Sequence, residues 1–260
     1  MKIAKTLLAA TAIVGISLSG AQAESHSLSI KIGTEGAYPP FNELKPDGSL
    51  VGFDVDIANA LCDEMGATCE FVTSDWDGII PGLLAGNYDA IIASMSITEE
   101  RLEVVDFTNK YYNTPPAIAV PKDSDITEAT DAALAGKTIG AQSSTTHSNY
   151  AEEKLSSASL TLYPTPDEYK LDIVNGRVDA VIDDVVVLSE WLETEDGACC
   201  KILGTLTPDP VINGVGAGIA IRKGEDDLKA KFNAAIDTIR ANGTYDTINA
   251  KYFDFDVYGG

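Results

Sequence analysis

An alternation of short, β-rich apolar runs with longer helical patterns is the feature of this sequence that most restricts its fold. Seven runs predict strands, and five longer segments with apolar residues at helical spacing predict helices, several of which end at Gly. The predicted strands are 28–33, 69–74, 89–94, 137–142, 160–164, 178–183 and 215–222, and the predicted helices are 54–65, 76–86, 168–176, 185–193 and 225–243. Such an alternation is typical of an α/β fold with mostly parallel sheets.

Two extended segments, 114–123 and 209–224, are rich in Pro and Gly. They predict the places where the chain passes between two lobes. No short repeat or low-complexity tract is present, which excludes solenoids and disordered arrays.

The first 23 residues have the three-part pattern of a secretory signal peptide. Two lysines precede an apolar stretch from about Leu7 to Leu18, which is shorter than the roughly 20 residues that span a bilayer. Small residues follow, and we expect cleavage after Ala23. Because Glu24 rather than a cysteine would then begin the mature chain, no lipid anchor is expected there, and the protein is expected in the periplasm.

The chain is strongly acidic, with 40 Asp and Glu against 18 Lys and Arg and a formal net charge of −22. A surface of this sign repels nucleic acid and anionic lipid, so no nucleic-acid partner is expected. Solubility is the plainest interpretation of the acidity, and steering of a cationic ligand is the alternative.

All four cysteines follow the predicted cleavage site, where an even count suggests disulfides. Cys62 lies late in a predicted helix and Cys69 begins the next strand, so a bridge between them would close a short loop and contribute about 2.5 kcal/mol. Cys199 and Cys200 are adjacent, and a bond between neighbours needs a strained backbone. A vicinal disulfide and two free thiols are equal alternatives here. No metal site is expected, because no histidine lies nearby, and no cofactor is expected.

Four segments, in consistent order, resemble the periplasmic amino-acid-binding proteins of ABC importers (bacterial solute-binding protein family 3). They are IGTEGAYPPFNELKPDGSLVGFDVDIANALC, SDWDGIIPGLLAGNYDAIIASMSITEER, GRVDAVIDD and NGTYDTINAKYF. The resemblance runs from about Ser27 to the C-terminus and is nearest the lysine/arginine/ornithine and histidine branch. It implies a two-lobed, type II binding-protein fold with a ligand cleft between lobes that two hinge strands join. Lobe 1 would comprise 24–114 and 213–260, and lobe 2 would comprise 115–212.

By the same resemblance, the protein captures an amino acid by lobe closure and delivers it to an ABC permease, as a monomer and not as an enzyme. Two alternatives remain open. A dehydratase acting on prephenate or arogenate is similar to this family and would need a positioned acid or base. In a sensory role, a membrane receptor would recognise the closed lobes.

The resemblance assigns Arg101 to the ligand's α-carboxylate, which a guanidinium holds by two parallel charge-assisted hydrogen bonds. Ser94, Ser96 and Thr98 would add hydroxyl and backbone partners around the ligand's head. On its own, an arginine after two glutamates is more often part of a solvated ion pair. The branch usually has another serine at Ala93, so one hydrogen bond to the ligand is expected to be missing.

Two further contacts to the ligand's head are expected from lobe 2. The segment after strand 137–142 should begin a helix, whose free N–H groups suit a carboxylate, with Thr146 as the contact and Ser144 or Thr145 as the N-cap. The resemblance assigns Asp184 to the ligand's α-ammonium, although the residue alone reads as an ordinary N-cap.

Two other residues, Asp183 and His147, differ from those usual in the branch, and their roles are open. Asp183 stands where the branch commonly has an amide. With Asp184 it resembles an acid–base pair, but neighbouring residues on a strand point to opposite faces. His147 stands where glutamine is frequent, and we expect it at the rim or on the surface rather than at a metal.

Side-chain recognition is expected from Tyr38, Trp76 and Glu35. The resemblance implies that the two aromatic residues sandwich the ligand's aliphatic stem, where their faces also attract a cation. It places Glu35 as an acid at the far end of the pocket. The alternative is that Tyr38 and Trp76 are core residues and Glu35 is a turn residue. Glu in place of the more usual Asp favours a shorter or reoriented cationic side chain. Arginine, ornithine and lysine are therefore the expected ligands, with a neutral polar amino acid such as glutamine, or a modified one, as the alternative.

Overall fold

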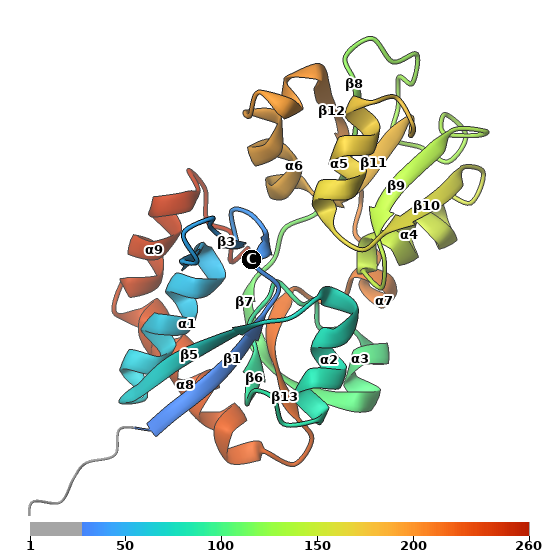
Figure 1. Cartoon of the computed structure of the whole chain (residues 1–260). Helices are drawn as coiled ribbons and strands as arrows, with labels where there is room; N and C mark the ends of the chain where they lie inside the picture. Colours follow the sequence, from blue (N-terminus) through green and yellow to red (C-terminus); the bar gives the residue numbers. More distant parts are fainter. Residues whose placement is uncertain (1–27, 260) are drawn as a thin grey trace, which may run out of the picture.

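Two five-stranded sheets, each flanked by helices, form two lobes in this computed structural model, which describes residues 28–259 (Figure 1). The first sheet has the order β5-β1-β6-β13-β7 and contains β1 (Leu28–Thr34), β5 (Ala67–Thr73), β6 (Ala90–Ile91), β7 (Val105–Tyr112) and β13 (Ala217–Arg222). The second has the order β10-β9-β11-β8-β12 and contains β8 (Pro116–Pro121), β9 (Thr138–Gln142), β10 (Ser159–Tyr163), β11 (Ala180–Asp184) and β12 (Cys200–Thr205). The predicted two-lobed α/β fold is confirmed.

A small third sheet and the helices complete the lobes. The small sheet contains β2 (Ala37–Tyr38), β3 (Asn42–Leu44) and β4 (Leu50–Val51). Lobe 1 carries α1 (Phe53–Glu64), α2 (Trp76–Leu84), α3 (Glu99–Val104), α8 (Asp226–Ala241) and α9 (Thr244–Tyr252). Lobe 2 carries α4 (Thr146–Lys154), α5 (Pro166–Val174), α6 (Val185–Leu192) and the 3-10 turn η1 (Asp196–Cys199), and α7 (Pro210–Asn213) lies beside α4. Within residues 28–259 no helix is long and apolar enough to cross a bilayer, and the predicted signal peptide lies outside this range.

Each large sheet is covered by helices on both faces, which explains why its strands read as continuous apolar runs. In β11, Ile182 belongs to the cluster that packs under α4, and its neighbour Val181 belongs to the cluster under α5 and α6. Successive residues of a strand alternate between faces, so both must be apolar when both faces are covered. In lobe 1, α1 and α8 cover one face of the sheet, and α2 covers the other.

Every predicted strand and helix is present, but the sheets are mixed rather than mostly parallel. The pairs β1–β5, β1–β6, β9–β10 and β9–β11 are parallel. Strand β13 runs antiparallel to β6 and β7, and β8 runs antiparallel to β11 and β12. The physical reason is that β8 and β13 enter their sheets directly from the other lobe, without the helical crossover that would return the chain in a parallel direction.

The chain passes between the sheets twice, in the short stretch 113–115 between β7 and β8 and in the stretch 206–216 between β12 and β13. Strand β8 therefore occupies most of the predicted passage segment 114–123 and is itself a buried part of lobe 2. Its Pro residues stand at its two ends.

One glycine is needed where the small sheet meets α1. Gly52 has φ 130°, and a Cβ added there would lie 2.2 Å from the carbonyl oxygen of Phe41. The close approach places Phe41 against Tyr112, with ring centroids 4.5 Å apart, inside the core of lobe 1. The loop after β1 is thereby anchored beside the hinge strand β7.

Cys62 and Cys69 form the predicted disulfide, which joins the last turn of α1 to β5. Cys199 is exposed and Cys200 is buried; both are free thiols, and their sulfur atoms lie 2.6 Å apart in a thiol–thiol hydrogen bond. Burial is the main cause that raises the pKa of the Cys200 thiol to about 12, so this thiol is protonated near neutral pH.

We expect alkylation of the natively folded, non-reduced protein to leave Cys62 and Cys69 unlabelled, because both sulfur atoms are in the bond. Peptide mass analysis measures this, and the same protein unfolded and reduced before alkylation provides the positive control. Labelling of both cysteines without reductant would contradict the pairing.

Candidate functional site

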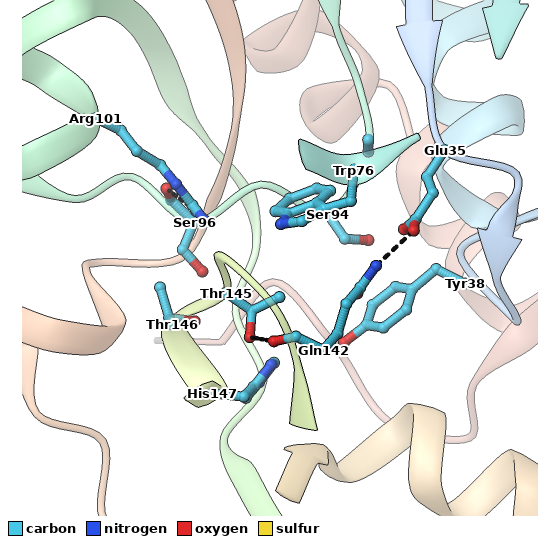
Figure 2. A pocket seen from close by; sticks show the side chains of 11 residues that line it. Glu35, Tyr38, Trp76, Ser94, Ser96, Arg101, Gln142, Thr145, Thr146 and His147 are labelled. Carbon is cyan, nitrogen blue, oxygen red and sulfur yellow. Dashed lines mark hydrogen bonds between the residues drawn. The ribbon is translucent and has the colours of Figure 1, made fainter. Parts of the chain in front are cut away.

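A cavity of about 340 Å³ lies between the two lobes, and seven of the nine residues expected around the ligand line it (Figure 2). Lobe 1 contributes Glu35, Tyr38, Trp76, Ala93, Ser94, Ser96 and Arg101, and lobe 2 contributes Gln142, Thr145, Thr146 and His147. Asp184 lines an adjoining cavity of about 530 Å³, whereas Thr98 lines neither cavity and caps α3 instead. The two cavities share Tyr38, Ser94, Ser96, Thr146 and His147, so they adjoin each other in the cleft between the lobes.

The cleft lies where strands end. In lobe 1, Glu35 follows β1, Trp76 follows β5 and Ser94 follows β6. In lobe 2, Gln142 and Asp184 are the last residues of β9 and β11. The carboxyl ends of parallel strands share one edge of a sheet, which is where open α/β sheets bind ligands.

Arg101 lies in the first turn of α3, where Thr98 caps the helix by accepting the Arg101 backbone N–H at 3.2 Å. Its guanidinium donates to the carbonyl oxygen of Ser96 at 3.0 Å and, across the cleft, to that of Ser144 at 3.2 Å. The guanidinium carbon also lies 5.4 Å from the centre of the Trp76 ring. Burial lowers the pKa of Arg101 to about 10, against the raising effect of Glu100, so the group remains charged at neutral pH. Arg101 is therefore a cation that hydrogen bonds hold in place at the wall of the cavity, and it is not part of a solvated ion pair.

Ser94 forms a hydrogen bond with Asp54, a residue that the sequence analysis did not identify. Its hydroxyl donates to the buried carboxylate of Asp54 at 3.0 Å, which also accepts from Asn42 at 2.9 Å and from the Tyr111 hydroxyl at 2.8 Å. Burial raises the pKa of Asp54 to about 6, and these three hydrogen bonds act in the opposite direction. Because its proton is committed to Asp54, the Ser94 hydroxyl faces the cavity as an acceptor.

The start of α4 forms the wall of lobe 2. Thr145 is the N-cap, which is one of the two N-cap residues predicted from the sequence. It makes a reciprocal capping box with Ser148. The Thr145 hydroxyl also donates to the carbonyl oxygen of Gln142 at 2.9 Å. Thr146 follows as the first helical residue and lines the cavity. The N–H groups of this first turn have no carbonyl partner within the helix, so they suit an anionic group.

Glu35 and Gln142 meet across the cleft. The Gln142 amide nitrogen donates to the Glu35 carboxyl at 2.6 Å and to the carbonyl oxygen of Pro164 at 3.0 Å. Burial is the largest influence on Glu35 and raises its pKa to about 7; the hydrogen bond from Gln142 opposes this, and Asp183 adds to it. A carboxyl held in this way would gain a strong partner in a cationic side chain.

Asp184 is the N-cap of α6, which is one of the two functions that the sequence allowed. One of its carboxylate oxygens caps α6 by accepting the Val186 backbone N–H at 2.7 Å, and the other accepts the hydroxyl of Thr114 in the first passage between the lobes. Burial raises the pKa of Asp184 to about 7, with Thr114 opposing. The residue is buried and lines the larger cavity.

Asp183 faces a different set of partners from Asp184, as expected for neighbouring strand residues, and both are buried. The Asp183 carboxylate accepts the Tyr38 hydroxyl at 2.5 Å and the Tyr169 hydroxyl, and it lies 3.2 Å from Nδ1 of His147. His147 was expected at the rim or on the surface. That prediction is wrong, because its side chain is only 18% exposed and forms part of the cavity wall. Burial lowers the pKa of His147, against the effect of Asp183.

Cross-lobe contacts surround the cleft. The Trp76 indole nitrogen donates to the carbonyl oxygen of Ser144 at 3.0 Å, and the Ser143 hydroxyl donates to Asp77 at 3.1 Å. With the contacts of Glu35 and Arg101, they hold the lobes together around the cavity. The structure therefore represents the closed arrangement of the two lobes.

Sequence reasoning missed Gln142, Thr145 as a wall residue, and the supporting Asp54. Gln142 had a usable signal, because it ends a predicted strand directly before a predicted helix start. Asp54 had none, because an acid in the first turn of a helix is ordinary on its own.

The chain is similar to known proteins over most of its length. The family model described as bacterial extracellular solute-binding proteins, family 3, matches residues 30–255. The L-arginine-binding protein of Pseudomonas aeruginosa is 46% identical over 233 residues, which cover 88% of this chain and 90% of the relative. The histidine-binding periplasmic protein of Salmonella typhimurium is 39% identical over 234 residues, covering 89% of this chain and 90% of that protein.

A solved structure agrees with this. An ancestral arginine-binding protein bound to arginine superposes with a TM-score of 0.80 and 36% identity, and the match covers 86% of this chain and 98% of that one. The family match spans both lobes and the cleft between them. This chain belongs to the bacterial extracellular solute-binding proteins, family 3.

Proposed function

We propose that this protein binds a basic amino acid, with arginine foremost, in the cleft between its lobes and delivers it to an ABC permease. The observation that carries the proposal is the presence of a held cation and a half-buried acid in one cavity. Figure 2 places Arg101 and Glu35 on opposite sides of that cavity, with the Trp76 ring between them. An amino acid with a cationic side chain has the complementary charges, an α-carboxylate at one end and a cation at the other.

Each end of the ligand would have its own contacts. Arg101 and the first turn of α4 at Thr146 would hold the α-carboxylate. Asp184 would accept from the α-ammonium, with the Ser94 hydroxyl and the backbone at Ser96 beside it.

The side chain of the ligand would be recognised at the other end of the cavity. Tyr38 and Trp76 would lie along its stem, and Glu35 would pair with its distal cation. Arginine comes first among the basic ligands because of the names of the relative and of the solved structure.

The lobe boundaries inferred from the sequence belong to this proposal, with 24–114 and 213–260 in one body and 115–212 in the other. Hinge motion would take place at 113–115 and 206–216, where the chain passes between the sheets. A mature, monomeric protein in the periplasm fits the compartment named for the histidine-binding relative. The curated relatives reported above are named as binding proteins, which favours binding over dehydratase activity.

A thermal-shift screen of the mature protein against amino acids tests the function. A ligand at a hundred times its dissociation constant stabilises the folded state by about 2.7 kcal/mol, which raises the melting temperature by a measurable amount. We expect arginine, ornithine and lysine to raise it more than glutamine does. A larger shift with glutamine would favour the neutral alternative, and a phenylpyruvate assay with prephenate tests the enzymatic one.

The affinity for arginine should rise with pH between about 5.5 and 8. The Glu35 carboxyl has a pKa of about 7 in the closed cleft, above its ordinary value of 4.5, so below about pH 7 it is mostly protonated and cannot pair with a cation. Pairing with a guanidinium therefore releases a proton. Calorimetry at pH 6 in buffers of different ionisation enthalpy should show more protons released by arginine than by glutamine, which shares the head group and lacks the side-chain charge. Equal release would contradict the pairing of Glu35 with the cation.

A further inference from the structure

We propose that Asp183 is a positioning residue that holds the Tyr38 hydroxyl across the cleft and thereby stabilises the closed form. The proposal rests on the proposed function, since closure matters only if the cleft takes a ligand. It assigns a role to an acid that makes none of the expected ligand contacts and stands where the resembling branch commonly has an amide.

Asp183 is 3% exposed, and four polar groups lie within hydrogen-bonding distance of its carboxylate. It accepts the Tyr38 hydroxyl at 2.5 Å, the Tyr169 hydroxyl, and the backbone N–H of Asp184 at 2.7 Å. Nδ1 of His147 lies 3.2 Å from the oxygen that faces Tyr38.

Among these neighbours, Tyr38 alone comes from the other lobe. Tyr38 ends β2 in lobe 1, whereas Tyr169 is on α5, His147 is on α4 and Asp184 ends β11, all in lobe 2. Rotation of the lobes about the hinge separates the Tyr38 hydroxyl from Asp183 and leaves the other three contacts in place. The open form therefore keeps Asp183 hydrogen-bonded, and the contact with Tyr38 adds stability to the closed form alone.

The contact also orients the Tyr38 ring. Tyr38 is 8% exposed, and its ring lies 5.9 Å, centre to centre, from that of Phe41 in a stacked arrangement. Phe41 fixes one face of the ring, and Asp183 fixes the hydroxyl at its tip. The edge that lines the cavity is thus set by both lobes together, and only after closure.

This role differs from recognition of the ligand's side chain. The Tyr38 hydroxyl is committed to Asp183 and is not available to the ligand, so its removal should weaken all ligands by a similar factor. A residue that contacts the side chain would instead change the order of preference.

Tyr38→Phe and Tyr169→Phe form a matched pair that tests the proposal. Each removes one hydroxyl that donates to the same carboxylate and keeps the ring, but the first bond crosses the cleft and the second lies within lobe 2. Calorimetry with arginine, ornithine, lysine and glutamine gives the dissociation constants. Thermal melting of the ligand-free proteins and X-ray scattering with and without arginine complete the set.

We expect Tyr38→Phe to weaken every ligand by about tenfold or more, as for a lost hydrogen bond to a charged group, with an unchanged melting temperature of the ligand-free protein. Tyr169→Phe should lower the melting temperature of the ligand-free protein and change affinity by less than about threefold, because its bond is present in both forms. In an Asp183→Asn background the effect of Tyr38→Phe should become smaller, since the charge that strengthens the bond is gone.

Three results would overturn the proposal. Equal losses of affinity in Tyr38→Phe and Tyr169→Phe would show that no lobe closure depends on this contact. A loss confined to one class of ligand would make Tyr38 a side-chain contact, and a lower melting temperature of ligand-free Tyr38→Phe would mean that the bond exists before ligand binds. Failure of the wild-type protein to bind any of the four amino acids is a separate outcome, which would refute the proposed function and with it this role of Asp183.

Discussion

Arg101→Ala is expected to abolish measurable binding of every amino acid in calorimetry. All amino acids share the α-carboxylate, and removing one partner of a desolvated charge pair costs about 2 to 5 kcal/mol. The side chain also donates to Ser96 and to Ser144 of the other lobe, so its loss removes a cross-lobe contact as well.

Arg177→Ala is the matched control for this variant. Arg177 is an arginine of lobe 2 that is paired with Asp172, and its side chain is 60% exposed. An exposed pair contributes little, so this variant should bind as the wild type does. Near-normal affinity in Arg101→Ala would show that the site as a whole is wrongly assigned.

Glu35→Gln is expected to act selectively. The substitution removes the counter-charge for a distal cation but leaves an amide that can hydrogen-bond. Arginine, ornithine and lysine should therefore weaken by about 10- to 100-fold, whereas glutamine should change little or improve. The proton released by arginine binding at pH 6 should also fall, because the group with the raised pKa is gone.

Glu70→Gln provides the comparison, since Glu70 is an exposed acid of β5 that accepts from Ser29 far from the cleft. It should leave the whole affinity panel unchanged. If Glu35→Gln weakened all ligands equally, Glu35 would support the closed cleft through Gln142 and would not recognise the side chain.

The sequence alone determined seven of the strands and five of the helices, because each of these has a local signal. Apolar runs predicted the buried strands, helical spacing predicted five helices, and the spacing of Cys62 and Cys69 predicted their bond. Local signals were too weak for β7, whose residues mix polar with apolar side chains, and for β12. The direction of β8 and β13 had no local signal at all, because it depends on how the chain crosses between lobes.

For the candidate site, too, the sequence determined some features and the tertiary structure determined the others. Most positions that line the cleft came from the resemblance of four sequence segments to a known family, and the helix starts at Arg101 and Thr146 also have local capping signals. Only the tertiary structure brought Glu35 to Gln142, 107 residues away. It likewise brought Tyr38 to Asp183 over 145 residues. Such contacts join the two lobes, so they depend on the geometry of the two passages between the lobes, which no local pattern of side chains encodes.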